Sequence, residues 1–519
     1  CVDEIDAMKW DAVVLTACDV EQKHAFEIEI AEILHELNDF AERFLVVDDR
    51  PSNIRIGSGG ATLLVLEYLH DRFDKSYEKW RVLLIHSGGL SQRLPTASAI
   101  GKVFMLLPNG KTFLEMKLLS YRPIVDAMPP GVVICSSDTL EYIPSDIHIG
   151  LSEVTLFAHP STIKVATEHG VYVMKHDQLW RVLQKPTEQT LRLNDGLIET
   201  TDRRNEGNAL LGVDGVSKLM VDQRSGNDNS IINEPEREEY TLTDSFFILS
   251  PRIVGDLIAL KRCTPIECET CCYGDFLRAL GTSPLWDYFD VCEPLARARR
   301  AYANVFRNRS NEVIRLPKNS FFHFGTVLEL LMHYMPSSIF MNQFKITPQQ
   351  SICSIIASNS QIGERSVVEL CDFRCGVDIG DDCVISCCSS DHHVVIPNRV
   401  IATTITIRHM IDALVGRHLR FVTVAFSVDD NLKAKNLDDL RWFSHRVDSY
   451  GSVDGSLWNL PIFAVCASAS ESLDATLYAI INGPPRGGEL LSIADVLRMK
   501  DIGEMLAYRK IIKLTSLAH

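Results

Sequence analysis

The sequence predicts an α/β protein in two parts, a mostly parallel sheet with helices on both faces and then a coil of short parallel strands. Two observations predict this class. Over residues 1–340, short apolar runs alternate with amphipathic stretches, which is the pattern of a parallel sheet. Further on, Ile362, Ile379 and Ile396 recur at intervals of 17, which is typical of a parallel β-helix with about three hexads per coil. We therefore divide the chain into residues 1–340 and 341–519.

The elements of the first part follow from hydrophobic patterning. Short apolar runs predict buried strands at residues 11–17, 44–47, 81–86, 131–135 and 240–249. Periodic stretches predict helices at residues 20–37, 61–70, 253–259 and 275–280, the second of them opened by a glycine turn at 56–60. The alternating pattern of this part ends near residues 320–326. Residues 186–239 are polar and rich in Asn, Asp, Gly and Arg, which predicts a long insertion or mobile loop.

In the second part, the repeat has the internal spacing of a β-helix. Another aliphatic residue lies six positions after the first two markers, at Val368 and Ile385, and a small residue lies four positions after them, at Ser366 and Cys383. The alternative is an antiparallel region with an accidental repeat, but three markers at one interval favour the coil. A strand at residues 421–428 and helices at 475–481 and 493–508 are expected to follow.

Composition excludes several classes of protein. The 519 residues are 46% hydrophobic and 23% charged, and no run of 18 apolar residues occurs, so we expect no transmembrane helix. The formal charge of −16 repels phosphate backbones and anionic lipid, so we expect neither nucleic acid nor a membrane as partner. The 15 cysteines are scattered and no secretory signal opens the chain, which predicts free thiols and a cytoplasmic location. Only Cys268 and Cys271 have zinc-knuckle spacing, so no zinc site is expected.

The strongest chemical signal follows the predicted strand at residues 81–86. Two glycines there let the backbone approach a ligand closely, serines add donors, and an arginine and a lysine offer charge to phosphate oxygens. The residues are Ser87, Gly88, Gly89, Ser91, Arg93 and, nine positions further, Lys102. The loop lacks the spacing of a Walker A motif and of a dinucleotide fingerprint. The alternative is a tight turn with solvated cations.

Two carboxylates and a second lysine extend this signal. Asp138 follows the strand at residues 131–135, and Asp244 lies within an apolar strand, where a carboxylate is costly unless it is paired or metal-bound. Such a pair suits Mg²⁺ beside a triphosphate, although Asp138 equally suits a helix cap. Lys185 could hold a second phosphate or could be a solvated lysine before a loop.

Taken together, these motifs resemble the sugar-nucleotide pyrophosphorylases. A strand leads into Gly-Gly-x-x-x-Arg-Leu-Pro, and Gly-Lys, a strand-end Asp and Lys-Pro follow in that order. Within this superfamily, several runs resemble the fucose-1-phosphate guanylyltransferases, also called GDP-L-fucose pyrophosphorylases. They are IGSGGATL at residues 56–63, LIHSGGLSQRLPTASAIGKVF at 84–104, AHPSTIKVATEHGVYV at 158–173, YGDFLRALG at 273–281 and TVAFSVDDNLK at 423–433. The resemblance is spread from about residue 10 to residue 508.

The resemblance implies a Rossmann-like nucleotidyltransferase domain followed by a short left-handed parallel β-helix. It implies that L-fucose 1-phosphate attacks the α-phosphorus of GTP, giving GDP-L-fucose and pyrophosphate. The loop from Gly88 to Arg93 and Lys102 would hold the triphosphate, Asp138 and Asp244 would bind Mg²⁺, and Lys185 would bind the sugar phosphate. Arg93, Lys102 and Lys185 are then the catalytic candidates. The loop departs from the family pattern where it has Ser91 and Gln92.

Further candidates each have a structural alternative. Gly57, Gly59 and Gly60 would contact the nucleotide or merely pack as a turn. His159, His169, Asp275 and His323 would line the sugar pocket or be structural. The alternative functions are the same chemistry with another nucleotide or sugar, a small-molecule sugar kinase, and a non-catalytic platform. The sequence indicates no oligomer interface.

Overall fold

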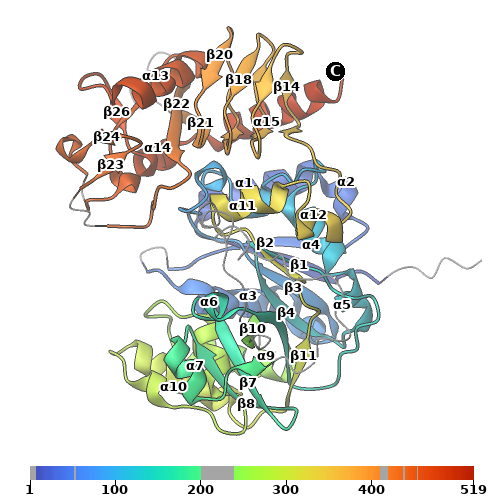
Figure 1. Cartoon of the computed structure of the whole chain (residues 1–519). Coiled ribbons are helices and arrows are strands. Elements are labelled where there is room, and N and C mark those ends of the chain that lie inside the picture. The colour runs from blue at the N-terminus through green and yellow to red at the C-terminus, as the bar shows by residue number, and fades with distance from the viewer. Residues whose placement is uncertain are drawn as a thin grey trace, which may run out of the picture.

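The computed structural model describes residues 8–51, 54–199, 239–408, 419–435, 439–452 and 454–518. A sheet with helices around it forms the first part of the chain. A stack of short strands forms the later part, and the two parts lie at opposite ends of the long axis of the molecule (Figure 1). The predicted α/β class, with a mixed and mostly parallel sheet, is confirmed. The division at residue 340 stays a prediction, since one hydrophobic core runs through both parts.

Four parallel strands form one half of the sheet, in the order β2 (Phe44–Asp48), β1 (Ala12–Ala17), β3 (Arg81–His86) and β4 (Gly131–Ser136). All four were expected from their apolar runs. Leu15 pairs with Ile85, and Ile85 pairs with Cys135. The carboxyl ends of these strands therefore meet at one edge, where ligands bind in open α/β sheets.

The other half of the sheet is built on β10 (Glu239–Leu249), which runs antiparallel to β4 and to β6 (Val154–Ser161). Phe247 pairs with Ile134, so the earlier residues of β10, including Asp244, extend beyond the carboxyl end of β4. The half is completed by β7 (Gly170–Lys175), β8 (Gln178–Gln184), β9 (Ile198–Glu199) and β11 (Asn311–Arg315), and β5 (Thr139–Glu141) pairs separately with β12 (Phe321–His323).

Helices cover both faces of the sheet because alternate residues of each buried strand point to opposite sides. Val13 of β1 packs in one core with Phe26 of α1, whereas Val14 packs in another with Leu66 of α3. The helices of this part are α1 (Val20–Glu32), α2 (Leu34–Leu37), α3 (Gly57–Phe73), α4 (Phe113–Ser120), α5 (Arg122–Ala127), α6 (Ile163–Ala166), α7 (Glu188–Leu193), α9 (Pro251–Cys263), α10 (Leu295–Phe306), α11 (Val327–Tyr334) and α12 (Ile339–Gln343).

Several predicted boundaries were wrong. The helix expected at residues 20–37 is interrupted at Ile33, and the one at 493–508 is two helices because Asp501 caps a new one. The expected glycine turn is the first turn of α3 itself. Residues 275–280 form a π-helical turn (Cys272–Phe276) and a 3-10 turn (Leu277–Ala279). The expected insertion at 186–239 begins with α7 and β9, and residues 200–238 lie outside the described residues.

Short parallel strands that pair within three separate sheets form the later part, as the repeat predicted. They are β13 (Ser351–Ile352), β14 (Ile355–Ile356), β15 (Gln361–Ile362), β16 (Val367–Glu369), β17 (Asp372–Phe373), β18 (Val377–Ile379), β19 (Val384–Ser386) and β20 (Val394–Ile396). Val367 pairs with Val384, and Val384 pairs with Ile401, so the pairing repeats the 17-residue interval. Each turn of the coil therefore buries the same positions as the next.

A hairpin and three helices close the coil. The hairpin is β21 (Val400–Arg408) and β22 (Leu419–Ser427), and the helices are α13 (Ala469–Asn482), α14 (Ile493–Met499) and α15 (Ile502–Ser516). The short strands β23 (Arg441–Trp442), β24 (His445–Arg446), β25 (Phe463–Ala464) and β26 (Leu490–Leu491) lie between them. No helix within the described ranges is both long and apolar enough to cross a membrane.

Buried contacts join the coil end to the sheet part. Arg509 of α15 donates to the carbonyl of Phe104 at 2.9 Å, and its Nε lies 3.0 Å from Glu29 of α1. Phe104 and Val368 belong to one continuous core. The two parts therefore pack as one body, which places the coil close to the loops of the sheet.

Candidate functional site

The glycine loop after β3 is tied to the end of β1. The backbone N–H of Ser87 donates to Thr16 Oγ1 at 3.1 Å, and Ser87 Oγ donates to the Thr16 carbonyl at 2.8 Å. A Cβ on Gly88 would lie 3.0 Å from the backbone nitrogen of Cys18, so glycine permits this close approach. In the described part of the chain, the N–H groups of residues 90–93 have no acceptor. This loop can therefore offer backbone donors to an anion.

Ser91 adopts a left-handed backbone conformation, with a φ of 48°. Its carbonyl accepts the N–H of Leu94 at 2.8 Å, which closes the turn that carries Arg93. The left-handed region favours glycine, so the serine is an unfavourable residue at this position.

Lys102 and Asp138 form an ion pair at the carboxyl edge of the sheet. Lys102 Nζ donates to Asp138 Oδ2 at 3.1 Å, and the lysine side chain is only 10% exposed. Gly101 precedes it with a φ of 113°, and a Cβ there would lie 2.9 Å from the ring of Phe26. Burial alone would raise the pKa of Asp138, but Lys102 and His323 hold it well below its usual value. The carboxylate is therefore ionised and ready to bind a cation.

His323 joins this pair from β12. Its Nε2 lies 3.7 Å from Asp138 Oδ2, and its Nδ1 lies 2.9 Å from Glu329 Oε1. Burial alone would lower the pKa of His323, but the two carboxylates raise it to about 9. Thr326 and Glu329 form the capping box of α11, which holds Glu329 in place. Asp138 is thus flanked by two positive charges.

Asp244, on the antiparallel strand β10, lies near the group formed by Asp138 and His323. Its Oδ1 accepts the N–H of Gly170 at 3.0 Å and lies 3.7 Å from Nδ1 of His169. A Cβ on Gly170 would lie 2.3 Å from Asp244 Oδ2, so the carboxylate requires glycine there. The rings of His169 and His323 have centroids 5.9 Å apart. The two histidines therefore connect Asp244 to Asp138.

Three predicted cations share one neighbourhood. The charges of Arg93, Lys102 and Lys185 all act on the ammonium of Lys433 and help to lower its pKa, after partial burial. Lys185 follows β8 in a left-handed conformation with a φ of 45°, and its N–H donates to the His169 carbonyl at 2.9 Å. Among the described residues, the side chains of Arg93 and Lys185 have no ion-pair partner. Such a group of cations suits an anion.

A buried network that the sequence did not reveal supports both aspartates. Lys117 of α4 and Glu141 of β5 are fully buried and 3.2 Å apart. Lys117 Nζ also donates to the Thr139 carbonyl at 2.7 Å, and the hydroxyl of Tyr121 donates to Glu141 at 2.9 Å. Ser245 donates to the same carboxylate at 3.5 Å. Thr139 and Ser245 directly follow Asp138 and Asp244 in the chain. One signal was present, a lysine in the apolar run FLEMKLLS.

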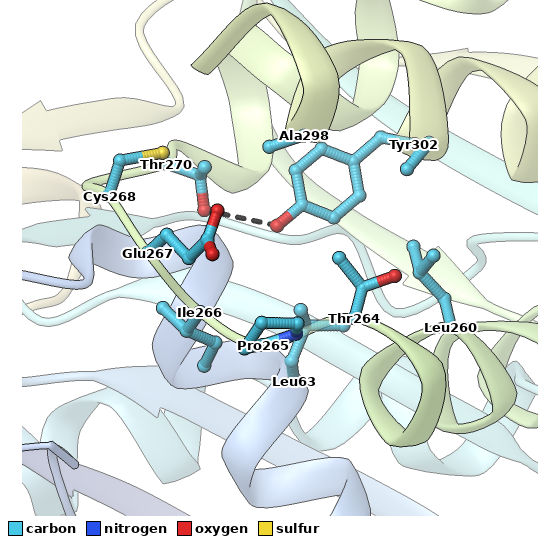
Figure 2. A pocket seen from close by; sticks show the side chains of 11 residues that line it. Leu63, Leu260, Thr264, Pro265, Ile266, Glu267, Cys268, Thr270, Ala298 and Tyr302 are labelled. Carbon is cyan, nitrogen blue, oxygen red and sulfur yellow. Dashed lines mark hydrogen bonds between the residues drawn. The ribbon is translucent and has the colours of Figure 1, made fainter. Parts of the chain in front are cut away.

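The glycines of α3 are used for packing. A Cβ on Gly57 would lie 2.3 Å from the Thr270 carbonyl, and one on Gly59 would lie 2.5 Å from Thr270 Oγ1. A cavity of about 30 Å³ lies beside this contact, where Thr270 and Tyr302 are hydrogen-bonded at 3.2 Å (Figure 2). It holds about one water molecule and is far too small for a purine. Nucleotide contact by Gly57, Gly59 and Gly60 stays a prediction.

Two other candidates are buried. His159 is 4% exposed, its ring stacks on Phe321 at a centroid distance of 3.9 Å, and its Nε2 lies 2.8 Å from Thr243 Oγ1. Asp275 is also 4% exposed and accepts from Arg299 Nε at 2.6 Å. Both are held by protein partners, so a role in binding the sugar stays a prediction for each.

One family model and several known proteins are similar to this chain. The model of the fucose pyrophosphorylase domain matches residues 74–481. The chain is 30% identical to a mouse (Mus musculus) fucose-1-phosphate guanylyltransferase, over 97% of this chain and 93% of the relative. It is 28% identical to the human protein of the same name, over 97% and 90%. A bifunctional fucokinase/GDP-fucose pyrophosphorylase of Arabidopsis thaliana is 26% identical over 72% of this chain and 36% of its own length.

The matched range takes in the glycine loop, Lys102, Asp138, Lys185 and Asp244, together with most of the strand coil. Both the domain model and the full-length similarity point to the same group of enzymes. The chain belongs to the fucose pyrophosphorylase family.

Proposed function

We propose that the cation group at the carboxyl edge of the sheet transfers GMP from GTP to L-fucose 1-phosphate. The chain is a nucleotidyltransferase of the fucose-1-phosphate guanylyltransferase type. In the reaction, a phosphate oxygen of the sugar phosphate forms a bond to the α-phosphorus of GTP. The bond between the α-phosphorus and the bridging oxygen breaks, and pyrophosphate leaves with the electron pair. The products are GDP-L-fucose and pyrophosphate.

The observation that carries this assignment is a series of contacts that joins the two lysines. Lys102 pairs with Asp138, and His323 and His169 lead from there to the backbone of Lys185. Arg93 and the N–H groups of residues 90–93, which have no acceptor in the described part of the chain, lie in the loop before Lys102. Transfer between phosphates needs positioning and charge neutralisation more than a nucleophilic side chain. Arg93, Lys102 and the loop would bind the triphosphate, and Lys185 the sugar phosphate. Each of these roles places a cation where negative charge accumulates during the transfer.

Magnesium fits this site only together with substrate. Within the described residues, no three His, Cys, Asp or Glu side chains converge as a metal cage. Mg²⁺ is commonly bound by one or two carboxylates plus substrate phosphates, so Asp138 and Asp244 suffice once a triphosphate is present. When bound, the ion would neutralise charge on the phosphates. Lys102 is paired with Asp138, the carboxylate that would hold the metal, so both lie where the triphosphate would be bound.

An assay of pyrophosphate release tests the assignment. The purified chain is incubated with Mg²⁺, L-fucose 1-phosphate and either GTP, ATP or UTP. We expect release with GTP, and a loss of about 100-fold or more in Lys102→Ala and Asp138→Ala. Parallel incubations replace L-fucose 1-phosphate with another sugar phosphate or with free fucose. If pyrophosphate is released only with another nucleotide or another sugar phosphate, the chain has the related specificity instead. ADP formation from ATP and free fucose would indicate a sugar kinase. Rates within a few-fold of wild type in both variants would refute the site.

Three wider expectations belong to the same proposal. The left hand of the coil and the division into residues 1–340 and 341–519 are supported by the resemblance to the pyrophosphorylases. A cytoplasmic location is supported by the cysteines, which are all free thiols in the part of the chain that the structure describes.

A further inference from the structure

A short turn at the end of the coil carries Lys433. The strand β22 ends at Ser427, and the N–H of Ser427 donates to Asp430 Oδ2 at 2.7 Å. The N–H of Lys433 donates to Asn431 Oδ1 at 3.2 Å. Leu432, the residue before it, is 3% exposed and packs in the main core. The backbone at Lys433 is therefore fixed by local hydrogen bonds and by an apolar anchor.

The same turn packs against the segment that follows the glycine loop. Val428 is 6% exposed and lies in one core cluster with Leu94 and Ala97. Leu94 directly follows Arg93 in the chain. The turn and the segment that follows the glycine loop therefore share one apolar core.

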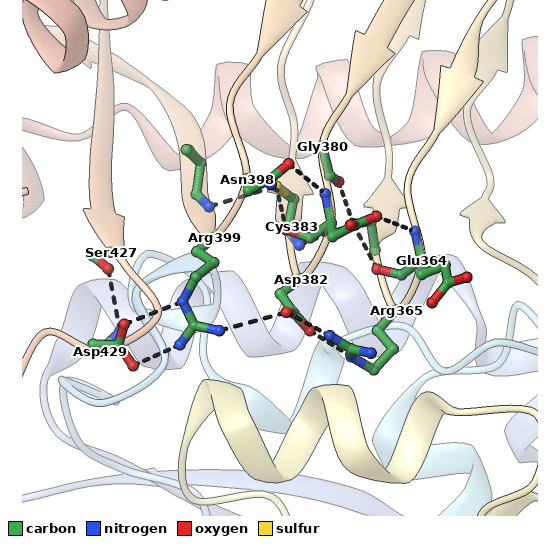
Figure 3. Close-up of polar contacts among 12 residues, drawn as sticks. Glu364, Arg365, Gly380, Asp382, Cys383, Asn398, Arg399, Ser427 and Asp429 are labelled. Carbon is green, nitrogen blue, oxygen red and sulfur yellow. Dashed lines mark hydrogen bonds and ion pairs between the residues drawn. The ribbon is translucent and has the colours of Figure 1, made fainter. Parts of the chain in front are cut away.

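A ladder of ion pairs along the coil holds the turn from the other side. Arg365 pairs with Asp382 at 2.6 Å, Arg399 lies 3.4 Å from Asp382, and Arg399 binds both carboxylate oxygens of Asp429 at 3.1 and 2.6 Å (Figure 3). The carbonyl of Arg399 also accepts the N–H of Val428 at 3.1 Å. A two-point Arg–carboxylate contact fixes orientation as well as distance. The turn is thus held by both the coil and the sheet.

Lys433 itself has no carboxylate partner among the described residues. Partial burial and the positive charges of Arg93, Lys102 and Lys185, in that order, lower its pKa. Four cations close together repel one another, and one carboxylate, Asp138, acts on Lys433 in the opposite sense. A polyanion bound among them would remove this repulsion.

We propose that Lys433, supplied by the strand coil, binds the β- and γ-phosphates of the nucleotide and the pyrophosphate formed from them. This inference rests on the proposed function and extends it, because it makes the coil a part of the active site. Arg93 and Lys102 come from the loop after β3 and Lys433 from the turn after β22. The leaving pyrophosphate is then held between the two parts of the molecule.

Calorimetric titration of the full chain with pyrophosphate and Mg²⁺ tests the proposal without turnover. We expect Lys433→Ala to raise the dissociation constant for pyrophosphate about tenfold or more, the loss expected for one charge-assisted hydrogen bond, and Lys433→Arg only a few-fold. In the reverse reaction with GDP-fucose, the KM for pyrophosphate should also rise more in Lys433→Ala than in Lys433→Arg. Lys435→Ala is the matched control. Lys435 lies two residues on and pairs with Asp454 at 3.3 Å, so its loss should leave both constants unchanged.

The outcomes separate this inference from the function on which it rests. If wild type releases pyrophosphate from GTP and L-fucose 1-phosphate but Lys433→Ala binds pyrophosphate within twofold of wild type, the role of Lys433 is refuted and the function stands. If Lys435→Ala weakens binding as much as Lys433→Ala, the effect is general electrostatics and the inference also fails. If wild type itself shows no transfer with any nucleotide, the proposed function fails.

Discussion

Lys117 and Glu141 form an ion pair 3.2 Å apart in which neither side chain has any exposed surface. The pair lies directly behind the aspartates of the site, since Lys117 also holds the carbonyl of Thr139, the residue after Asp138. Removing one member of such a pair leaves an uncompensated buried charge, whereas replacing both with apolar groups is much less harmful.

We therefore expect Lys117→Met to lower the free energy of unfolding by about 3–5 kcal/mol. The double variant Lys117→Met/Glu141→Leu should recover a large part of this loss, because it removes both charges. Urea denaturation followed by fluorescence measures both. A single variant as stable as wild type would show that the pair is not buried as described. The double variant should still have reduced transfer activity, because Thr139 and Asp138 lose their support.

A second prediction concerns Ser91, which holds a φ of 48° in the glycine loop. A left-handed conformation costs a residue with a Cβ roughly 1 kcal/mol or more compared with glycine. Ser91→Gly should therefore be neutral or slightly stabilising by thermal unfolding, despite its more flexible unfolded chain, and should retain activity. Ser91→Val should lose stability and raise the KM for GTP, because a β-branched residue is strained there. Equal behaviour of the two variants would contradict a left-handed residue at this position.

The sequence was sufficient for the parallel strands and the coil, because their signals are local. Apolar runs predicted β1, β3 and β4, and a 17-residue repeat predicted strand pairing at the same interval. Helix ends at Ile33 and Asp501 were missed, because caps and breaks depend on single side-chain contacts. The partners of the site were missed for another reason. Glu141 and Lys433 are far from the glycine loop in the chain, and only the folded topology brings them near it.

Asp49 provides a prediction about pH. Burial, and then the nearby carboxylates of Asp48 and Asp19, raise the pKa of Asp49 to about 6. The folded state therefore holds this proton more tightly than the unfolded chain, where the pKa is about 4. The contribution of Asp49 to the free energy of unfolding is therefore most favourable below pH 4. It falls as the pH rises from about 4 to 6 and stays at its lower value above that.

Asp49→Asn should remove that dependence and stabilise the protein at pH 7.5 by roughly 1–2 kcal/mol, after allowance for partial exposure. Asp48, the preceding residue, provides a control, because its substitution should change the free energy of unfolding in the opposite direction. Asp48 is paired with Lys23 at 3.2 Å and with Arg50 at 3.0 Å, and these bonds hold its pKa below the usual value despite burial. Asp48→Asn should therefore destabilise the protein at pH 7.5. Urea unfolding at pH 4.5 and 7.5 measures both, and a stability loss in Asp49→Asn at pH 7.5 would refute the raised pKa.

The last prediction separates the ladder from the lysine that it positions. Arg399 holds Asp429 with two hydrogen bonds, and Asp429 lies in the turn that carries Lys433. The pair is exposed, so Arg399→Ala should cost at most about 1 kcal/mol of stability. It should nevertheless raise the KM for pyrophosphate a few-fold with little change in kcat, because the turn is no longer held at the site. Arg365→Ala removes the rung at the other end of the ladder without touching the turn, and it should leave the KM unchanged.

A double-mutant cycle completes the argument, because residues that act through one another give non-additive effects. If Arg399 acts by placing Lys433, Arg399→Ala should have no further effect on the KM for pyrophosphate in the Lys433→Ala background. Fully additive effects would mean that Arg399 supports the site by another route. If the KM changed as much in Arg365→Ala as in Arg399→Ala, loss of any ion pair of the ladder would disturb the coil as a whole. The two-point contact between Arg399 and Asp429 would then have no special role in holding Lys433 at the phosphates.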